Sequence, residues 1–165
     1  FLDEFYSQED AQRAVRLHLE GIVSILPWIA TIDAFQHWVY TTPGHSREQR
    51  HAKWLELGER FGSELDWAGF EDWRKVSWQK QLHLFSYPFY YIEYGIAQLG
   101  ALQMWLQYRE NPENALANYA TAMRLGGSRP LPNLFEAGGM SFDLGRSTVQ
   151  GLIDAVRDKL STLPA

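Results

Sequence analysis

The first forty residues carry one apolar face at helical spacing. Its members recur at i, i+4, i+7 and i+11, and they are Val15, Leu19, Ile22 and Leu26. This is the 3.6-residue period of an amphipathic helix, so the pattern predicts helix over residues 8–40. Proline removes a backbone donor and clashes with the preceding turn. We therefore expect either one long helix with a kink at Pro27 or two helices joined there.

Capping signals predict two further helices. Ser46 and Gln49 have the spacing of a capping box, in which each side chain accepts a hydrogen bond from the other residue's backbone N–H, and the helix should run to about Arg60. Asn111-Pro112 combines an N-cap residue with proline at the first helical position. We expect that helix to end at Gly126-Gly127, because glycine favours the backbone conformation that terminates helices.

The remaining chain is also predicted to be helical. Residues 62–78 should form short helices on an irregular path, and a further short helix should cover 132–137. A terminal amphipathic helix should begin at Gly145 or Ser147 and run to about Leu160. The stretch 88–108 is apolar nearly all round, which predicts a buried helix in which Glu93 would need an arginine partner. No run alternates with the period of a strand. We therefore predict an all-α fold without significant sheet, as a single helical unit over 1–165.

Composition narrows the class of protein. The 165 residues are 45% hydrophobic and 21% charged, with a net charge of −5, which excludes a disordered chain and disfavours nucleic acid as a partner. The longest apolar run is interrupted by polar residues, so we interpret it as a core helix of a soluble protein and expect no membrane association. No signal peptide is recognisable, so we expect a cytoplasmic protein. Cysteine is absent, and the chain begins at Phe1 without an initiator methionine, which suggests a piece of a larger protein.

Familiar catalytic and metal-binding motifs are missing. The histidines are His18, His37, His45, His51 and His83, and none forms the His-Glu-x-x-His pair of a zinc peptidase helix. Asp33 and His37 lie at i, i+4 and could bind one metal ion together, but a hydrogen bond between them on the helix surface is the favoured interpretation. Phosphate-binding glycine loops and Gly-x-Ser-x-Gly are absent as well. We expect no metal ligands and no cofactor-binding residues in this chain, and no catalysis by it alone.

One aromatic segment, residues 81–94, stands apart from the rest. Its polar rings recur at i, i+4, i+8 and i+11, and they are His83, Tyr87, Tyr91 and Tyr94. On a continuous helix their polar tips would lie along one face, although Pro88 could delay the start of that helix. Two interpretations are open. Spacing alone favours an aromatic core face, whereas phenol and imidazole donors in a site would hold a carbonyl or a developing oxyanion.

The same segment resembles a known family. Residues 88–103 read Pro-Phe-Tyr-Tyr-Ile-Glu-Tyr-Gly-Ile-Ala-Gln-Leu-Gly-Ala-Leu-Gln and follow Gln81-Leu82-His83. This run closely resembles the C-terminal region of oligoendopeptidase F, a zinc metallopeptidase of the thimet-oligopeptidase group. Three other stretches fit the same family, and they are His18–Val23, Asp33–Trp38 and Leu125–Pro132. Together the similar stretches extend over nearly the whole chain.

The resemblance implies a mainly helical, zincin-like peptidase with a deep channel that hydrolyses short peptides in the cytoplasm. In that family a His-Glu-x-x-His helix and a further Glu hold zinc, and these lie N-terminal to the part matched by this sequence. Tyr94 would donate to the oxyanion, with Tyr87 the next candidate for that role. His83 would contact the substrate backbone near the scissile bond, and Tyr91, like Tyr87, would support substrate binding.

Two hypotheses follow for the protein as a whole. The first is a C-terminal fragment of such a zinc endopeptidase, inactive alone, whose partners are short peptide substrates and the missing N-terminal part. The second is a stand-alone, non-catalytic helical module for binding or scaffolding. A fragment should expose surface that its missing part covers. We therefore expect the tyrosine face to be partly open to solvent, or covered in a homodimer formed through exposed apolar surface.

Overall fold

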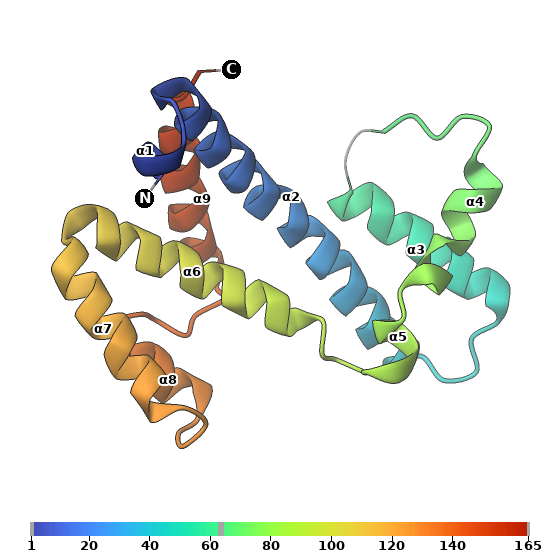
Figure 1. Cartoon of the computed structure of the whole chain (residues 1–165). Coiled ribbons are helices and arrows are strands. Elements are labelled where there is room, and N and C mark those ends of the chain that lie inside the picture. The colour runs from blue at the N-terminus through green and yellow to red at the C-terminus, as the bar shows by residue number, and fades with distance from the viewer. Residues whose placement is uncertain (1, 63–64, 165) are drawn as a thin grey trace. The chain divides into compact units, whose positions relative to one another are not determined.

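The computed structural model describes residues 2–62 and 65–164, and every regular element in these ranges is helical (Figure 1). The predicted all-α fold without a sheet is confirmed for this part of the chain. The elements are α1 (Leu2–Phe5), α2 (Gln8–Thr41), α3 (Arg47–Phe61), α4 (Glu71–Val76), the 3-10 helix η1 (Ser77–Lys80), α5 (His83–Ser86), α6 (Ile92–Glu110), α7 (Pro112–Leu125), α8 (Leu131–Ala137) and α9 (Arg146–Ser161).

The chain divides into two compact units. Unit 1 contains the described residues up to Glu20 and those from Ile96 onward, and unit 2 is Gly21–Gly95. Helices α2 and α6 each begin in one unit and continue into the other. The predicted single helical unit over 1–165 is thus built from two compact units, and their action as one domain stays a prediction.

Unit 2 is organised around a cluster of aromatic and aliphatic side chains. The buried members are Ile32, Phe35, Trp54, Leu57 and Trp78. Phe35 is at the centre, with ring centroids 5.2 Å from Trp54 and 5.5 Å from Trp78. Aromatic side chains remove large apolar areas from water and favour such edge-to-face and tilted contacts. This cluster therefore holds the second half of α2 against α3 and η1.

Local signals set most helix boundaries as predicted. Ser46 Oγ accepts from the backbone N–H of Gln49, and Gln49 Oε1 accepts from that of Ser46, so the capping box begins α3. Asn111 caps α7 through the N–H of Asn114, and α7 ends at Leu125. Helix α2 continues through Pro27, which selects the single long helix of the two alternatives. A kink at Pro27 stays a prediction.

Unit 1 is held together by polar as well as apolar contacts. Leu152 and Val156 are the buried residues of α9. The guanidinium of Arg16 on α2 donates to the carbonyl oxygens of Leu163 at 2.8 Å and of Leu160 at 3.1 Å. The last carbonyls of a helix have no partner within the helix. Leu160 lies in the last turn of α9 and Leu163 follows the helix, so Arg16 fixes the C-terminal end of α9 to α2.

The prediction for residues 88–108 was wrong in two respects. Helix α6 begins at Ile92, not at Pro88, and it is buried on one side only, since Leu102 is 1% exposed whereas Tyr108 is 49% exposed. Glu93 lies on the exposed side. A solvated carboxylate has no desolvation cost to offset, so Glu93 needs no arginine partner.

One described helix, α2, is long and apolar enough to cross a membrane by length and composition, with an 18-residue window of mean hydropathy 1.3. Core helices pass the same test, so this is weak evidence for a membrane span. Within unit 2 the apolar side chains of Ile29, Ile32 and Phe35 on α2 are buried.

Candidate functional site

The segment 77–94 folds as two short helical turns, a loop and the start of α6. Helix α5 ends at Ser86, and its last bond runs from the N–H of Tyr87 to the carbonyl of His83. A residue that precedes proline is disfavoured in the helical region, and Tyr87, before Pro88, has φ −138° and ψ 70°. The continuous helix that would align His83, Tyr87, Tyr91 and Tyr94 therefore does not form, and the interruption allowed for at Pro88 is observed.

The chain nevertheless brings these side chains together by folding back on itself. The imidazole of His83 is the centre, and four phenol rings surround it, at centroid distances of 5.0 Å for Tyr91, 5.8 Å for Tyr94, 6.1 Å for Tyr87 and 6.3 Å for Tyr90. We call these five residues the His83 cluster. All of the cluster lies within unit 2.

Hydrogen bonds orient the imidazole of His83. The side-chain nitrogen of Gln81 lies 2.8 Å from Nδ1, and the hydroxyl oxygen of Tyr94 lies 3.3 Å from Nε2. With the Gln81 amide donating, Nδ1 is an acceptor, so a neutral ring carries its hydrogen on Nε2. That hydrogen is donated to the Tyr94 oxygen. The O–H of Tyr94 is then free to donate to a ligand.

Tyr91 is held by a residue far away in the sequence. The indole N–H of Trp28 on α2 donates to the Tyr91 hydroxyl oxygen at 3.1 Å. The backbone of α6 comes close to α2 in this region, because a Cβ on Gly95 would lie 3.3 Å from a methyl carbon of Ile29. A Cβ at position 95 would therefore make an unusually tight contact, and the Ile29 side chain would have to shift by a few tenths of an ångström to admit it. Gly95 thus allows the approach that brings Tyr91 within reach of Trp28.

The loop before α6 is fixed by a buried glutamine. Gln36 on α2 is 1% exposed, and its Oε1 accepts from the backbone N–H of Phe89 at 3.0 Å. Phe89 has φ +60°, a left-handed conformation that is uncommon for a residue with a side chain. The Gln36 bond and ring contacts of Phe89 with His37 and Tyr40, at 5.0 and 5.1 Å, hold this conformation. The loop is thereby a defined part of the site.

The phenols of the His83 cluster are open to solvent. Tyr87 is 59% exposed, Tyr90 50% and Tyr94 43%, whereas His83 and Tyr91 are half-buried. The expectation that the tyrosine face is partly open to solvent is confirmed. The alternative of an aromatic core face is wrong for Tyr87 and Tyr94, since core side chains do not leave half of their surface in water.

A metal site is not found in the described ranges, because these residues contain no group of three or more His, Cys, Asp or Glu side chains arranged to hold an ion. Asp33 Oδ2 and His37 Nε2 lie 3.5 Å apart on the surface of α2, with no third ligand. The described residues therefore do not fit zinc. Because no third ligand accompanies Asp33 and His37, their proximity is better explained as a local interaction on the helix surface.

Sequence reasoning missed three residues of this arrangement. Tyr90 stacks on His83 with an interplanar angle of 12°, Gln81 bonds its Nδ1, and Trp28 holds Tyr91. The adjacency of Gln81 to His83 and of Tyr90 to Tyr91 was a usable signal once a turn at Pro88 was allowed. For Trp28 no local signal exists, because its partner is 63 residues away.

Solved structures of peptidases contain the same fold. A structure of PZ peptidase A with an inhibitor matches with a TM-score of 0.87 and 30% identity, over 94% of this chain and 28% of that one. A structure described as oligoendopeptidase F matches with a TM-score of 0.81 and 29% identity, over 94% of this chain and 28% of that one. Another oligoendopeptidase F structure, from Bacillus anthracis, matches with a TM-score of 0.73 and 26% identity, over 96% of this chain and 25% of that one. The chain is thus similar to one segment of the PZ peptidase A and oligoendopeptidase F structures.

The predicted resemblance is thus confirmed, and similarity to peptidase chains supports a peptidase-derived domain. The chain spans about a quarter of the length of the structures that it matches. No model of a protein family matches its sequence, and the comparison with curated proteins finds no significant match.

Proposed function

We propose that this chain is the C-terminal part of a zinc-dependent endopeptidase that hydrolyses short peptides in the cytoplasm. The observation that carries the proposal is the His83 cluster, in which exposed phenols surround an imidazole that is already oriented. The likeness to peptidase structures over 94% of the chain supports it. On this proposal the missing N-terminal part of the enzyme is the chain's partner.

The roles proposed for the cluster follow from its hydrogen bonds. Tyr94 receives a hydrogen bond from His83 Nε2 and has its own O–H free, so Tyr94 is the proposed donor to the oxyanion of the tetrahedral intermediate. His83 orients Tyr94 and contacts the substrate backbone near the scissile bond. Tyr91, fixed by Trp28, and the more exposed Tyr87 bind substrate, and Tyr87 is the second candidate for the oxyanion donor.

Zinc belongs to the proposed enzyme but not to the part of it described by this structure. Since residues 2–62 and 65–164 contain no suitable ligand group, the metal and the general base would be supplied from outside the chain. In zinc peptidases the metal polarises the scissile carbonyl and activates water. The chain's own contribution is donation of hydrogen bonds by its phenols and imidazole, and we expect the chain to be inactive alone.

The test is the substitution Tyr94→Phe in the intact protein that carries this chain. Loss of an oxyanion donor lowers kcat by about a hundredfold or more, with KM for a short peptide changed much less. Tyr108→Phe is the matched control, because Tyr108 is also an exposed tyrosine of α6 and lies outside the cluster. If Tyr94→Phe kept hydrolysis within about twofold of the unsubstituted protein, the role of Tyr94 would be refuted.

The larger proposal has a separate test in the gene. We expect the reading frame upstream of this chain to encode His-Glu-x-x-His in continuity with it. A start codon just before Phe1 would instead favour a stand-alone binding or scaffold module. A homodimer through the exposed tyrosines is the proposed state only for the separated chain, and analytical ultracentrifugation would detect it.

A further inference from the structure

Gln81 lies beside the His83 cluster, at the point where the chain passes from η1 into α5. Its backbone is extended, with φ −84° and ψ 93°, and is bonded on both sides. The N–H of Gln81 donates to the carbonyl of Trp78 at 3.1 Å, and the carbonyl of Gln81 accepts from the N–H of Leu84 at 3.1 Å. The side chain therefore extends toward His83 from a backbone that is held in place.

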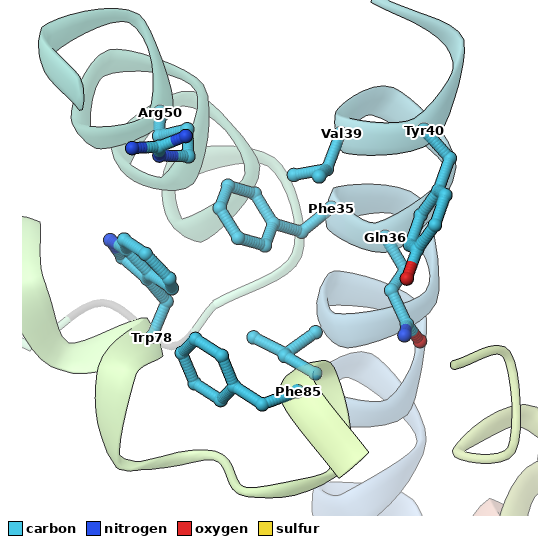
Figure 2. Close-up of a pocket in the computed structure, with 8 residues that line it drawn as sticks. Phe35, Gln36, Val39, Tyr40, Arg50, Trp78 and Phe85 are labelled. Carbon is cyan, nitrogen blue, oxygen red and sulfur yellow. The ribbon is translucent and has the colours of Figure 1, made fainter. Parts of the chain in front are cut away.

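The elements on either side of Gln81 pack on the core of unit 2. Trp78 of η1 and Phe85 of α5 stack with ring centroids 5.8 Å apart, and the Trp78 ring lies 5.5 Å from that of Phe35 on α2. Figure 2 shows these three rings next to one another. Because aromatic contacts fix both neighbouring elements, the distance between the Gln81 side chain and the imidazole of His83 is set by the core.

A glutamine amide can meet the Nδ1 of His83 in two ways. The structure places the amide nitrogen of Gln81 2.8 Å from Nδ1, and in this orientation the amide donates and Nδ1 accepts. In the opposite orientation the amide oxygen would accept from a hydrogen on Nδ1. A neutral imidazole carries a single ring hydrogen, so the bond made at Nδ1 decides whether Nε2 donates or accepts.

This choice determines what Tyr94 can do. The hydroxyl oxygen of Tyr94 lies 3.3 Å from Nε2. When Nε2 carries the hydrogen it donates to that oxygen, and the O–H of Tyr94 is free. When Nε2 is bare it accepts the O–H of Tyr94, which is then no longer available to a ligand.

We propose that Gln81 is a positioning residue of the candidate site. By donating to Nδ1, Gln81 keeps the ring hydrogen of His83 on Nε2 and so keeps the O–H of Tyr94 available to the substrate. The inference rests on the proposed function, because a free O–H matters for hydrolysis only if Tyr94 donates to the oxyanion.

No other group controls the ring hydrogen of His83 among the residues that the structure describes. Gln81 and Tyr94 are the groups hydrogen-bonded to the two ring nitrogens there, and no carboxylate in these ranges forms an ion pair with His83. The rings that face the imidazole are phenols, two from the loop after α5 and two from the region where α6 begins, and they are Tyr87, Tyr90, Tyr91 and Tyr94.

The first test locates the ring hydrogen of His83 in the intact, unsubstituted protein. Nitrogen NMR of protein isotopically labelled in its histidines distinguishes a ring nitrogen that carries hydrogen from a bare one, and His83→Gln identifies the signals. Above about pH 8, where histidine is ordinarily neutral, we expect the hydrogen on Nε2. A hydrogen on Nδ1, or one shared between both nitrogens, overturns the proposal. Neither hydrolysis nor the stability of a position-81 variant enters this measurement.

The second test is Gln81→Glu, which replaces a donor by a group that only accepts. While the imidazole is doubly protonated both nitrogens donate, so the O–H of Tyr94 stays free. Once the ring is neutral, the carboxylate keeps the hydrogen on Nδ1, and Nε2 accepts the O–H of Tyr94. The kcat of Gln81→Glu relative to the unsubstituted protein should therefore fall at least about tenfold between about pH 5 and pH 8, with KM changed much less.

Gln79→Glu is the matched control, because Gln79 is exposed on η1 and carries the same new charge two residues away. Its relative kcat should not change over this pH range. Gln81→Met removes the hydrogen bond without adding an acceptor, so its relative kcat should fall less than that of Gln81→Glu.

A pH-independent ratio for Gln81→Glu, an equal fall for Gln79→Glu, or a greater fall for Gln81→Met overturns the role of Gln81. The proposed function has its own readout in Tyr94→Phe. If Tyr94→Phe lowers kcat about a hundredfold while Gln81→Glu shows no dependence on pH, only the inference about Gln81 fails.

Discussion

The two compact units use their polar side chains differently. In unit 1 Arg16 donates to carbonyls at the end of α9, and the Gln107 side chain bonds the carbonyls of Gly138 and Gly139 and the amide of Asn118. In the described part of unit 2, buried donors of Gln36, Arg50 and Trp78 have no acceptor, and the buried Nε2 of His51 has no hydrogen-bond partner. Proteins normally pair their buried polar groups. Both units use polar side chains to hold their own elements together, as Gln36 does for the backbone N–H of Phe89, but the unpaired buried atoms of the described residues all lie in unit 2.

Aromatic side chains follow the same division. Among the residues that the structure describes, almost all ring pairs lie in unit 2, where they form the core around Phe35 and the His83 cluster. In unit 1 the pair Phe135 and Phe142, 5.2 Å apart, closes a small contact beside α8. The aromatic richness of the composition is thus concentrated in the unit that carries the candidate site, part of it as core and part as exposed phenols.

The largest effect that would test this comparison is expected for Arg16→Met. The substitution keeps the apolar stem but leaves the carbonyls of Leu160 and Leu163 without their charged donor, so unfolding free energy should fall by about 2–3 kcal/mol. Urea denaturation of the chain measures it. Arg13→Met is the control, since the exposed Arg13–Asp10 pair should contribute less than about 1 kcal/mol. Equal effects of the two substitutions would refute a stabilising role for Arg16.

A smaller effect is expected for two tryptophans of unit 2. Trp54 and Trp78 are 4% and 8% exposed, but Trp54 Nε1 donates to Ser77 Oγ at 2.8 Å while Trp78 Nε1 has no acceptor. Both Trp→Phe substitutions remove similar volume, and only Trp54→Phe removes a hydrogen bond. We expect Trp54→Phe to destabilise the chain by about 1 kcal/mol more than Trp78→Phe. If Trp78→Phe instead lowered the unfolding free energy of the ligand-free chain more than Trp54→Phe does, the indole N–H of Trp78 would already be paired.

The smallest effect concerns Asp143, before α9 in unit 1. Hydrogen bonds from the Thr148 hydroxyl and then from the Gly145 N–H lower the pKa of the exposed Asp143 carboxyl. A lowered pKa in the folded state stabilises the chain above the unfolded-state pKa, and this stabilisation is lost as pH falls through the folded-state pKa. Thr148→Val should raise the Asp143 pKa toward its ordinary value, and Thr148→Ser should not. A carboxyl-carbon NMR titration that gives one pKa for all three chains would contradict this.

The helix boundaries that sequence analysis located correctly depend on neighbouring residues. Ser46 with Gln49 begins α3, and Asn111 with Pro112 begins α7, because each cap satisfies backbone N–H groups only three residues away. The start of α6 was misplaced for a related reason. Apolar composition continues from Pro88, but the backbone at Phe89 is left-handed and is held there by Gln36, 53 residues earlier.

The members of the candidate site were anticipated better than their arrangement. His83, Tyr87, Tyr91 and Tyr94 were selected because helical spacing and family resemblance agreed on them, and the structure gathers all four. The continuous helix on which their spacing would align them does not form. Their proximity instead arises from a turn at Pro88, which also brings Tyr90 onto the imidazole.

Information within about four residues was enough to establish helical class, caps and the amphipathic pattern, since hydrogen bonds in helices and caps join near neighbours. Long-range packing was needed for the rest. The Trp28–Tyr91 and Gln36–Phe89 bonds and the unpaired buried donors of unit 2 each depend on where distant side chains meet. A donor's lack of a partner is a property of its surroundings in space, and the order of residues along the chain does not contain it in readable form.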